Sequence, residues 1–422
     1  MNQQRTDRLV AVRRDLHRHP EPAWCEFYTT GRIVDELERI GVDELLIGPD
    51  LLDGDARMAV PEDAELDAWH ERAREAGARA DVLDKCDGGF TGALATIDRG
   101  PGPTVALRVD IDALPITESS ETDHQPAAAG FRSATDGYMH ACGHDAHTAI
   151  GVGVLERVVR SDFSGTFKLL FQPAEEVIGG GKAVAESGVL DDVDRLLALH
   201  IGLDHPTGEI VAGVDGFLAV RQFEATMTGE SAHAGGHPAG GRDAVQALAT
   251  AIQNLHAIRR HEDGATRVNA GVVEGGTATN IVPEHARMEG ELRGETTPLR
   301  EYMSERAETV IDHAAGMHDC EARVETIAEA PSAESDAELA EVVYETAAQV
   351  AGVDSRLRTA DLGGSEDATY LMKRVQDRGG LASFVGVGTD HPGGHHTPTF
   401  DVDERSLSIG VDLLASAIAR LW

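Results

Sequence analysis

Short apolar runs alternate with helical patterns in the first half of the chain. Residues 104–109 (TVALRV), 166–172 (TFKLLFQ) and 195–201 (RLLALHI) are β-rich runs and predict strands. Between the first two, residues 145–160 repeat apolar side chains every four positions, which predicts a helix. Strands that alternate with helices predict an α/β fold with a doubly wound, mainly parallel sheet. Such a sheet binds ligands just beyond the carboxyl ends of its strands.

The pattern changes near Gly216, where an α+β segment begins. Its expected elements, in chain order, are a strand at 223–228, a helix at 242–260, strands at 268–273 and 285–293, a helix at 299–315 and a strand at 320–327. This β-α-β-β-α-β order is the ferredoxin-like signature. A helical pattern resumes after Pro331, and residues 381–400 return to the pattern of the first half. We therefore expect a discontinuous main domain, 1–215 and 330–422, interrupted by an inserted domain, 216–329.

The net charge narrows the range of partners. The 422 residues include 37 Lys and Arg against 73 Asp and Glu, which gives a formal net charge of −36. So negative a protein is a poor partner for nucleic acid or for an anionic membrane surface. No apolar run approaches the roughly 20 residues of a membrane span, and residues 1–20 lack the apolar core of a signal peptide. We expect a cytoplasmic protein that binds neither nucleic acid nor membrane.

The kinds of charged residue add a second feature. Lysine occurs only at Lys85, Lys168, Lys182 and Lys373, and aromatic residues make up 4% of the chain. Many carboxylates with few lysines and aromatics are typical of a halophile's surface, although an ordinary acidic cytosolic protein would share the net charge. The four cysteines contain no C-x-x-C pair. A disulfide framework is therefore not expected, and a functional cysteine would be a metal ligand or a nucleophile.

The loop MHACGHDAH, residues 139–147, holds the densest candidate chemistry. Cys142 and His144 lie two residues apart in it, just before a predicted helix. A thiolate and an imidazole so placed could both reach one metal ion or bridge two. His140 and His147 flank this pair and are interpreted as decoys.

Further polar residues follow predicted strands. Glu175 and Glu176 end the motif FQPAEE, and because adjacent side chains leave the chain in different directions, one could ligate a metal while the other acts as a base. His200 closes the strand LLALHI, at the crevice of an α/β sheet, although a buried core histidine is the commoner outcome there. His395 and His396 lie in GGHHTPTFDVDE near the C-terminus.

Two aspartates complete the set of candidates. Asp110 and Asp112 in RVDIDALP could hold a ligating histidine in its proper tautomer. Together, these motifs place Cys, His and Glu donors in one domain, which is enough for a two-metal hydrolytic site with a carboxylate base. A nucleophilic Cys142 with His144 as its base is the alternative. It leaves the glutamate pair and the distal histidines unexplained.

The motifs and their order closely resemble the M20 metallopeptidase family, in its amidohydrolase branch of aminoacylase, hippurate hydrolase and auxin-conjugate hydrolase relatives. The matching motifs are, in chain order, RRDLHRHPE, RVDIDALP, MHACGHDAHT, FQPAEE, ALHIG, GESAHAGGHPAGGRDA, GGTATNIVP, GGSEDAT and HHTPTFDVDE. They span residues 13–404, which is nearly the whole chain. Within the branch, the long segment between Gly41 and Gly92, the AHAGGHP motif and QDRGGLASF resemble the enzymes that hydrolyse p-aminobenzoyl-glutamate.

The resemblance implies two divalent ions, Mn or Zn, in each subunit. The positions that match the family's metal ligands are Cys142, His144, Glu176, His200 and His396. Glu175 matches the general base and acid. The ligand precedes the Pro-x-Phe-Asp segment by two residues, which favours His396 over His395. Asp112 matches the aspartate that supports a ligand, and Asp110 stands where other branches of the family carry a metal-binding histidine.

The inserted domain is implied to contribute to the substrate site. His233, delivered across a dimer interface, matches the donor that stabilises the tetrahedral oxyanion, with Asn280 nearby. His237 is the local rival of His233. Arg293 matches a position that could clamp the substrate's α-carboxylate, and a salt-bridged arginine on the sheet surface is the alternative.

The activity that the resemblance implies is metal-dependent hydrolysis of the amide bond of an N-acyl or N-aroyl amino acid, with p-aminobenzoyl-glutamate as the candidate substrate. A general aminoacylase or hippurate-type hydrolase is the alternative. A non-catalytic partner subunit would require the loss of a ligand or of the base. The implied assembly is a homodimer through the inserted dimerisation or lid domain, or a complex with a homologous second subunit.

Overall fold

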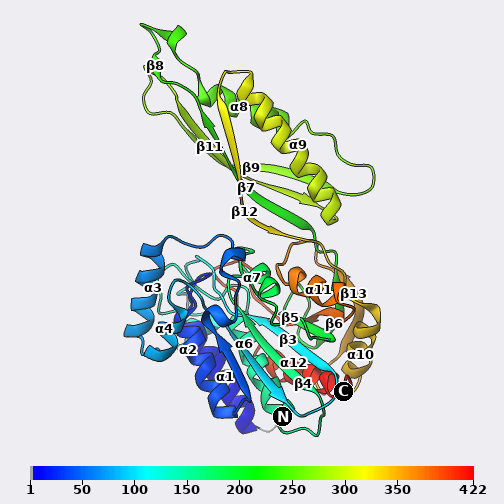
Figure 1. The fold of residues 1–422 in the computed structure, drawn as a ribbon. Helices are drawn as coiled ribbons and strands as arrows, with labels where there is room; N and C mark the ends of the chain where they lie inside the picture. The colour runs from blue at the N-terminus through cyan, green and yellow to red at the C-terminus, as the bar shows by residue number, and fades with distance from the viewer. Residues whose placement is uncertain (1–2) are drawn as a thin grey trace. The chain divides into compact units, whose positions relative to one another are not determined.

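The computed structural model describes residues 3–422, which form two compact units (Figure 1). The first unit comprises the chain up to Asp215 together with Ala333–Leu362 and Asp367–Trp422. The second comprises Gly216–Ser332 and Gly363–Glu366. The first unit is thus discontinuous in sequence, and most of the second is a single segment within it.

A sheet of eight strands forms the centre of the first unit. Its strands are, in spatial order, β1 (Glu44–Ile47), β2 (Ala93–Asp98), β4 (Thr166–Gln172), β3 (Thr104–Asp110), β5 (Arg195–Ile201), β14 (Leu381–Val387), β6 (Glu209–Asp215) and β13 (Ser355–Asp361). The strands β4, β3, β5 and β14 pair in parallel, as do β6 and β13. The pairs β1–β2, β2–β4 and β14–β6 are antiparallel.

The predicted α/β class is confirmed, but the prediction of a mainly parallel sheet is wrong, because the sheet is mixed. Two short connections explain the difference. Residues 99–103 join β2 to β3, and residues 202–208 join β5 to β6. A parallel crossover needs about a dozen residues, so neither connection can bring the chain back to the starting edge of the sheet. Strands β2 and β6 therefore run opposite to the parallel group.

Helices cover this sheet. They are α1 (Gln3–Arg18), α2 (Phe27–Ile40), α3 (Asp63–Glu75), α4 (Ala80–Cys86), α5 (Gln125–Ala129), α6 (His144–Val158), α7 (Gly180–Ser187), α10 (Ala337–Ala347), α11 (Ala368–Asp377) and α12 (Arg405–Ile418), with short 3-10 turns at Gly48–Asp50 and Gly54–Ala56. Helix α6 packs against α1 and α12, whereas α7 packs against α11. Every residue of β3 is buried, which requires cover on both faces of the sheet.

The second unit is built on a four-stranded antiparallel sheet. Its strands, in spatial order, are β12 (Glu321–Ala330), β7 (Ala219–Thr228), β11 (His285–Gly294) and β9 (Thr266–Gly275). Helices α8 (Ala244–Leu255) and α9 (Thr297–Gly316) lie along this sheet (Figure 1). A separate ribbon pairs β8 (Ala232–His233) with β10 (Ile281–Val282), next to a 3-10 turn at Pro238–Gly240.

Alternation along β7 sets the face that the helices cover. Phe223, Ala225 and Met227 are buried in a core with apolar residues of α8 and α9, whereas Glu224 and Thr226 between them are only half-buried. The helix-free face of the sheet is accordingly polar. Among residues 3–422, no helix combines the length and the apolar character needed to cross a bilayer.

Candidate metal centre

Cys142 and His144 are presented by the tight entry into helix α6. The intervening Gly143 has a φ of 87°, and a Cβ added to it would lie 2.6 Å from the Cγ2 atom of Ile201. Only glycine fits this left-handed turn against β5. The turn brings the Sγ atom of Cys142 to 3.4 Å from Nε2 of His200, the penultimate residue of β5. The loop motif and the strand-end histidine therefore meet, as the sequence predicted.

Glu175 and Glu176 follow β4 and approach the same place. Nε2 of His144 lies 3.7 Å from Oε1 of Glu176, and Nε2 of His396 lies 3.5 Å from Oε2 of Glu176. A side-chain oxygen of Glu175 lies within 4.8 Å of these atoms of His144 and Glu176. Glu175 is buried, with 6% of its surface exposed. One glutamate thus stands between two histidines and the other stands beside it.

Asp112 connects two of these residues. Its Oδ1 accepts a hydrogen bond from Nδ1 of His144 at 3.1 Å, and its Oδ2 accepts one from the backbone N–H of Glu176 at 2.9 Å. The first bond leaves the lone pair of His144 on Nε2, which faces Glu176. A single buried carboxylate therefore sets both the tautomer of the histidine and the position of the glutamate.

The consecutive histidines near the C-terminus both reach the cluster. Nδ1 of His395 lies 3.5 Å from Sγ of Cys142, and its Nε2 accepts the N–H of Leu203 at 3.1 Å. His396 adopts a left-handed φ of 59°, and its N–H donates to the carbonyl of Ala141 at 2.9 Å. A left-handed residue other than glycine is uncommon and often marks a functional position. Cys142, Glu176 and His396 form one of the donor groups close enough to share an ion.

The donors fit divalent metal ions. Ligand atoms around one Zn ion stand about 3–4 Å apart, because each lies about 2.0–2.3 Å from the ion, and the distances above fall in this range. Among the described residues, the buried Nε2 atom of His144 has no hydrogen-bond partner. Nδ1 of His200 donates to the carbonyl of Ile201 at 2.7 Å, which leaves its Nε2 lone pair toward Cys142. Two imidazole lone pairs thus face a thiol and a carboxylate.

The electrostatics of the site agree with a bound cation. Burial alone would lower the pKa of His144, but the charges of Asp110 and Glu176 and the hydrogen bond to Asp112 raise it to about 10. A field that holds a proton on an imidazole also holds a cation, which must displace that proton in order to bind. Burial lowers the pKa of His200 well below its usual value, and it lowers the pKa of His396 too. These two rings are therefore neutral and can act as ligands.

His140 and His147, the two decoys, have different surroundings. Nε2 of His147 accepts the N–H of Ile201 at 2.8 Å, and its Nδ1 makes a short contact with Asp110. Both nitrogens of His147 are thus occupied by protein partners. His140 is buried, and within residues 3–422 neither of its ring nitrogens has a hydrogen-bond partner. Burial lowers its pKa to about 3, so the ring is neutral.

A buried ionic network anchors the start of α6 to α1. Nε of Arg13 donates to Asp145 at 2.8 Å, and Arg13 also pairs closely with Asp401. His17 bridges Asp145 and Glu118, with distances of 2.9 Å from Nδ1 and 3.0 Å from Nε2. His17 therefore packs and anchors, which agrees with the expectation that it is no ligand. Asp145 directly follows His144, so the network also fixes the metal-centre loop.

The network predicts a dependence of stability on pH. Burial would lower the pKa of His17, but the hydrogen bonds to Asp145 and Glu118 raise it to about 9, above the ordinary value of 6.5. The stabilisation is fully present below pH 6.5 and is lost as the pH rises through 9. The difference corresponds to roughly 3 kcal/mol of unfolding free energy. Denaturant unfolding at pH 6, 7.5 and 9.5 should show this loss, and His17→Gln should flatten the profile. Parallel profiles for the two proteins would contradict it.

In the second unit, His233 and Asn280 are brought together. His233 in β8 pairs with Ile281 in β10, and the N–H of Ala234 donates to the carbonyl of Asn280 at 2.9 Å. The exposed ring of His233 accepts the N–H groups of Gly235 and Gly236 on Nδ1, at 3.1 and 2.9 Å. These bonds leave the ring proton on Nε2, so His233 presents a hydrogen-bond donor outward.

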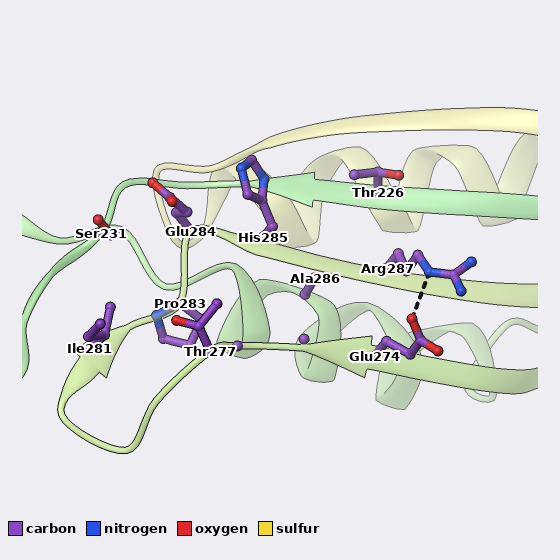
Figure 2. A pocket seen from close by; sticks show the side chains of 12 residues that line it. Thr226, Ser231, Glu274, Thr277, Ile281, Pro283, Glu284, His285, Ala286 and Arg287 are labelled. Carbon is purple, nitrogen blue, oxygen red and sulfur yellow. Dashed lines mark hydrogen bonds and ion pairs between the residues drawn. The ribbon is translucent and has the colours of Figure 1, made fainter.

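A pocket of about 440 Å³ lies beside the loop that carries Asn280 (Figure 2). It is lined by residues of β7, β9 and β11 and of the β9–β11 connection, which include Thr226, Glu274, Thr277, Ile281, Pro283 and Arg287. Figure 2 shows Arg287 paired with Glu274, at 3.0 Å. Arg287 also pairs with Glu224 at 2.9 Å and with Glu289 at 2.7 Å. Carboxylates surround this arginine, so it is not an open site for an anionic substrate.

Arg293 lies on the same strand, β11, and is also paired. Its Nε and Nη2 donate to the two carboxylate oxygens of Glu291 at 2.9 and 3.1 Å, and its Nη1 donates to Ser365 at 3.2 Å. This is the salt-bridged surface arginine that was the alternative to a carboxylate clamp. Binding a substrate carboxylate would require Arg293 to exchange its partner. The substrate-binding role of Arg293 stays a prediction.

Sequence reasoning missed two contacts at the metal centre. It did not foresee that His395 would lie against Cys142, nor that Glu26 would hold the turn before Glu175 by accepting the N–H of Ala174 at 2.7 Å. The paired histidines were a signal for the first contact. Nothing in the local pattern around Glu26 indicates the second, because 148 positions separate the partners.

The mixed α/β unit with its cluster of Cys, His and Glu donors defines a protein of the metallohydrolase type. The chain belongs to the peptidase family M20/M25/M40, whose family model matches residues 106–420. The family resemblance seen in the motifs is thereby confirmed.

Two relatives and one solved structure show how closely. Indole-3-acetyl-aspartic acid hydrolase of Enterobacter agglomerans is 44% identical over 411 residues, which cover 96% of this chain and 94% of the relative. One of the named subunits of the p-aminobenzoyl-glutamate hydrolase of Escherichia coli (strain K12) is 42% identical over 412 residues, which cover 97% and 94%. The crystal structure of the Bacillus subtilis YXEP protein, described as a dinuclear metal-binding peptidase, is 28% identical, with a TM-score of 0.72 and coverage of 100% and 99%.

Proposed function

We propose that this chain hydrolyses the amide bond of an N-acyl or N-aroyl amino acid, with metal-activated water as the nucleophile and Glu175 as the general base. The observation that carries the proposal is the position of Glu175. It is buried next to Glu176, and its carboxylate reaches the place where His144 and Glu176 meet. A carboxylate within reach of ligand atoms, but not needed as one of them, is what a general base requires.

Five residues would hold the metal ions. They are Cys142, His144, Glu176, His200 and His396, and this mixed thiolate, imidazole and carboxylate set suits Zn or Mn. Two bound divalent ions would supply a water of lowered pKa and a Lewis acid for the amide carbonyl. Asp112 would hold His144 and Glu176 in their ligating positions through the two hydrogen bonds that it accepts.

The chain's own groups then divide the proton and charge transfers. Glu175 would take the proton of the attacking water and return it to the leaving nitrogen. His233 would donate its Nε2 proton to the oxyanion, since Nδ1 is already an acceptor for Gly235 and Gly236. In this proposal His233 acts across a dimer interface formed by the second unit, a ferredoxin-like dimerisation or lid domain. Asn280 and Arg293 would bind the substrate.

The names of the relatives guide the substrate proposal. One relative is named for indole-3-acetyl-aspartate and another for p-aminobenzoyl-glutamate. Both compounds join an aromatic acyl group to an acidic amino acid. We therefore favour an aroyl or arylacetyl conjugate of Glu or Asp, with p-aminobenzoyl-glutamate first, over a general aminoacylase or hippurate-type substrate. The second relative is named as one subunit of its enzyme, so a complex with a homologous second subunit is an alternative to the homodimer.

A hydrolysis panel tests this function. The purified chain, in high salt to suit its acidic surface, would receive Mn or Zn and then p-aminobenzoyl-glutamate, indole-3-acetyl-aspartate, hippurate or an N-acetyl amino acid. We expect release of Glu or Asp from the first two at rates at least about 10-fold above the others, because extra pocket contacts give discrimination of this size. A chelator should abolish turnover, and added metal should restore it. Equal turnover of all four would favour the general aminoacylase. No turnover with two metals bound, alone or after co-expression with a homologous subunit, would overturn the proposal.

A further inference from the structure

The turn that carries the glutamate pair, residues 173–181 between β4 and α7, has an unusual backbone. Ala174 and Ile178 both have a φ of 56°, in the left-handed region that residues with a Cβ rarely adopt. Glu175, the proposed base, directly follows the first of them. Its own carbonyl accepts the N–H of Ile178 at 2.7 Å. The direction in which Glu175 leaves the chain therefore depends on a backbone conformation that Ala174 would not choose by itself.

Three buried carboxylates hold this turn by its backbone. Glu26 accepts the N–H of Ala174 at 2.7 Å, and Asp112 accepts that of Glu176 at 2.9 Å. Asp367 accepts the N–H groups of Gly180 and Gly181 at 3.1 and 2.7 Å. Hydrogen bonds from backbone N–H groups to carboxylates are among the stronger ones in proteins. The peptide groups on both sides of Glu175 are thus fixed, one by Glu26 and the other by Asp112.

Glu26 is itself rigidly placed. It precedes α2 and is fully buried, and its second carboxylate oxygen accepts the hydroxyl of Thr91 at 2.6 Å. The adjoining Gly92 donates its N–H to the hydroxyl of Thr30 at 2.9 Å. A Cβ on Gly92 would lie 2.8 Å from the carbonyl oxygen of Phe171, so this strand entry is pressed against the end of β4. Glu26 therefore cannot shift without moving two neighbouring elements.

We propose that Glu26 is a positioning residue for Glu175: by clamping the N–H of Ala174, it holds that residue in the left-handed conformation that aims the base into the site. The inference rests on the proposed role of Glu175. It assigns no contact with substrate or metal to Glu26. Glu176 keeps its own clamp from Asp112, so loss of Glu26 should disturb the base more than the metal ligands.

The same segment offers a matched control. Glu21 is also a buried glutamate beside the start of α2, and its carboxylate accepts the N–H groups of Tyr28 and Thr29, both at 2.8 Å. None of these bonds reaches the turn at 173–181. Glu21→Ala should therefore destabilise the fold in the way that Glu26→Ala does, and yet leave the geometry of Glu175 intact.

Two further variants separate positioning from general stability. Glu26→Gln keeps a carbonyl oxygen for the N–H of Ala174, and the Thr91 hydroxyl can turn to accept from the new amide. Ala174→Gly removes the Cβ that opposes the left-handed conformation, so the turn can hold its shape with less help. A merely structural role for Glu26 predicts no benefit from glycine at position 174.

The experiment measures kcat, KM, bound metal and thermal unfolding for wild type, these variants and the double variant Glu26→Ala/Ala174→Gly. We expect Glu26→Ala to lower kcat about 10–100-fold, as losses of supporting residues do, with KM and metal content unchanged. Glu26→Gln and Glu21→Ala should stay within about threefold of wild type in kcat, since one keeps the bond and the other never made it. The double variant should recover at least about fivefold over Glu26→Ala, the mark of coupled positions.

Three results would overturn the inference. They are a Glu26→Ala kcat within about twofold of wild type, a Glu21→Ala loss as large as that of Glu26→Ala, or no recovery in the double variant, because coupling is what a double-mutant cycle isolates. Each is read in a wild-type enzyme that hydrolyses its substrate and is silenced by Glu175→Gln. An inactive wild type, or an active Glu175→Gln variant, would instead mean that the proposed function itself has failed.

Discussion

Glutamine at position 175 is expected to silence the enzyme and to leave its fold and metal content unchanged. Gln matches Glu in shape, so the buried side chain keeps its packing beside Glu176. It cannot accept a proton from water, and general acid–base catalysis contributes about 10²–10⁴-fold to a rate. We therefore expect kcat for p-aminobenzoyl-glutamate to fall by about 10³-fold, measured by release of glutamate.

Glu176→Gln is the matched control for this variant. The two glutamates are adjacent, but Glu176 lies 3.7 Å from His144 and 3.5 Å from His396 and is assigned as a metal ligand. Its replacement should release metal as well as activity, whereas Glu175→Gln should release activity alone. Metal loss from Glu175→Gln, or full metal content in an inactive Glu176→Gln, would exchange the two assignments.

Local patterns were enough to predict much of the first unit. The runs 166–172 and 195–201 coincide with β4 and β5, and the helix predicted from residue 145 begins at His144. These segments have strong periodicity and clear turn residues, which is the information that a single sequence carries best. Cys142, His144, Glu176 and His200 could be grouped because each lies at the carboxyl end of a strand or in the loop before a helix.

The rest depends on contacts that no local pattern encodes. The directions of β2 and β6 follow from the lengths of connections and from which strands they join, and the sequence pattern did not identify either strand. Glu26 meets Ala174 across 148 positions, and Asp367 meets Gly181 across 186. A buried carboxylate and an exposed one look the same in sequence. Three-dimensional packing alone distinguishes them.

The choice between His395 and His396 shows the same limit on a smaller scale. Consecutive residues have no periodicity to separate them, and only the family resemblance favoured His396. Both rings reach the cluster, but by different routes: His395 lies 3.5 Å from Sγ of Cys142, and His396 lies 3.5 Å from a carboxylate oxygen of Glu176. The second nitrogen of His395 is already engaged with the N–H of Leu203.

A matched pair of asparagine variants decides between these two histidines. His396→Asn should preserve the backbone, because Asn tolerates the left-handed φ of 59° better than most residues. It removes the imidazole opposite Glu176, so we expect one of the two ions to be lost. Turnover should fall by at least about 100-fold, because even residues that only support a metal ligand cost 10–100-fold when they are replaced.

His395→Asn should keep both ions and lose no more than about 10-fold in turnover, as expected for a residue that supports the ligand Cys142. Metal analysis of the two purified variants, each dialysed against the same metal buffer, gives the answer before any assay is run. If His395→Asn loses an ion and His396→Asn keeps both, His395 is the ligand. The left-handed conformation of His396 would then serve to turn its neighbour toward Cys142.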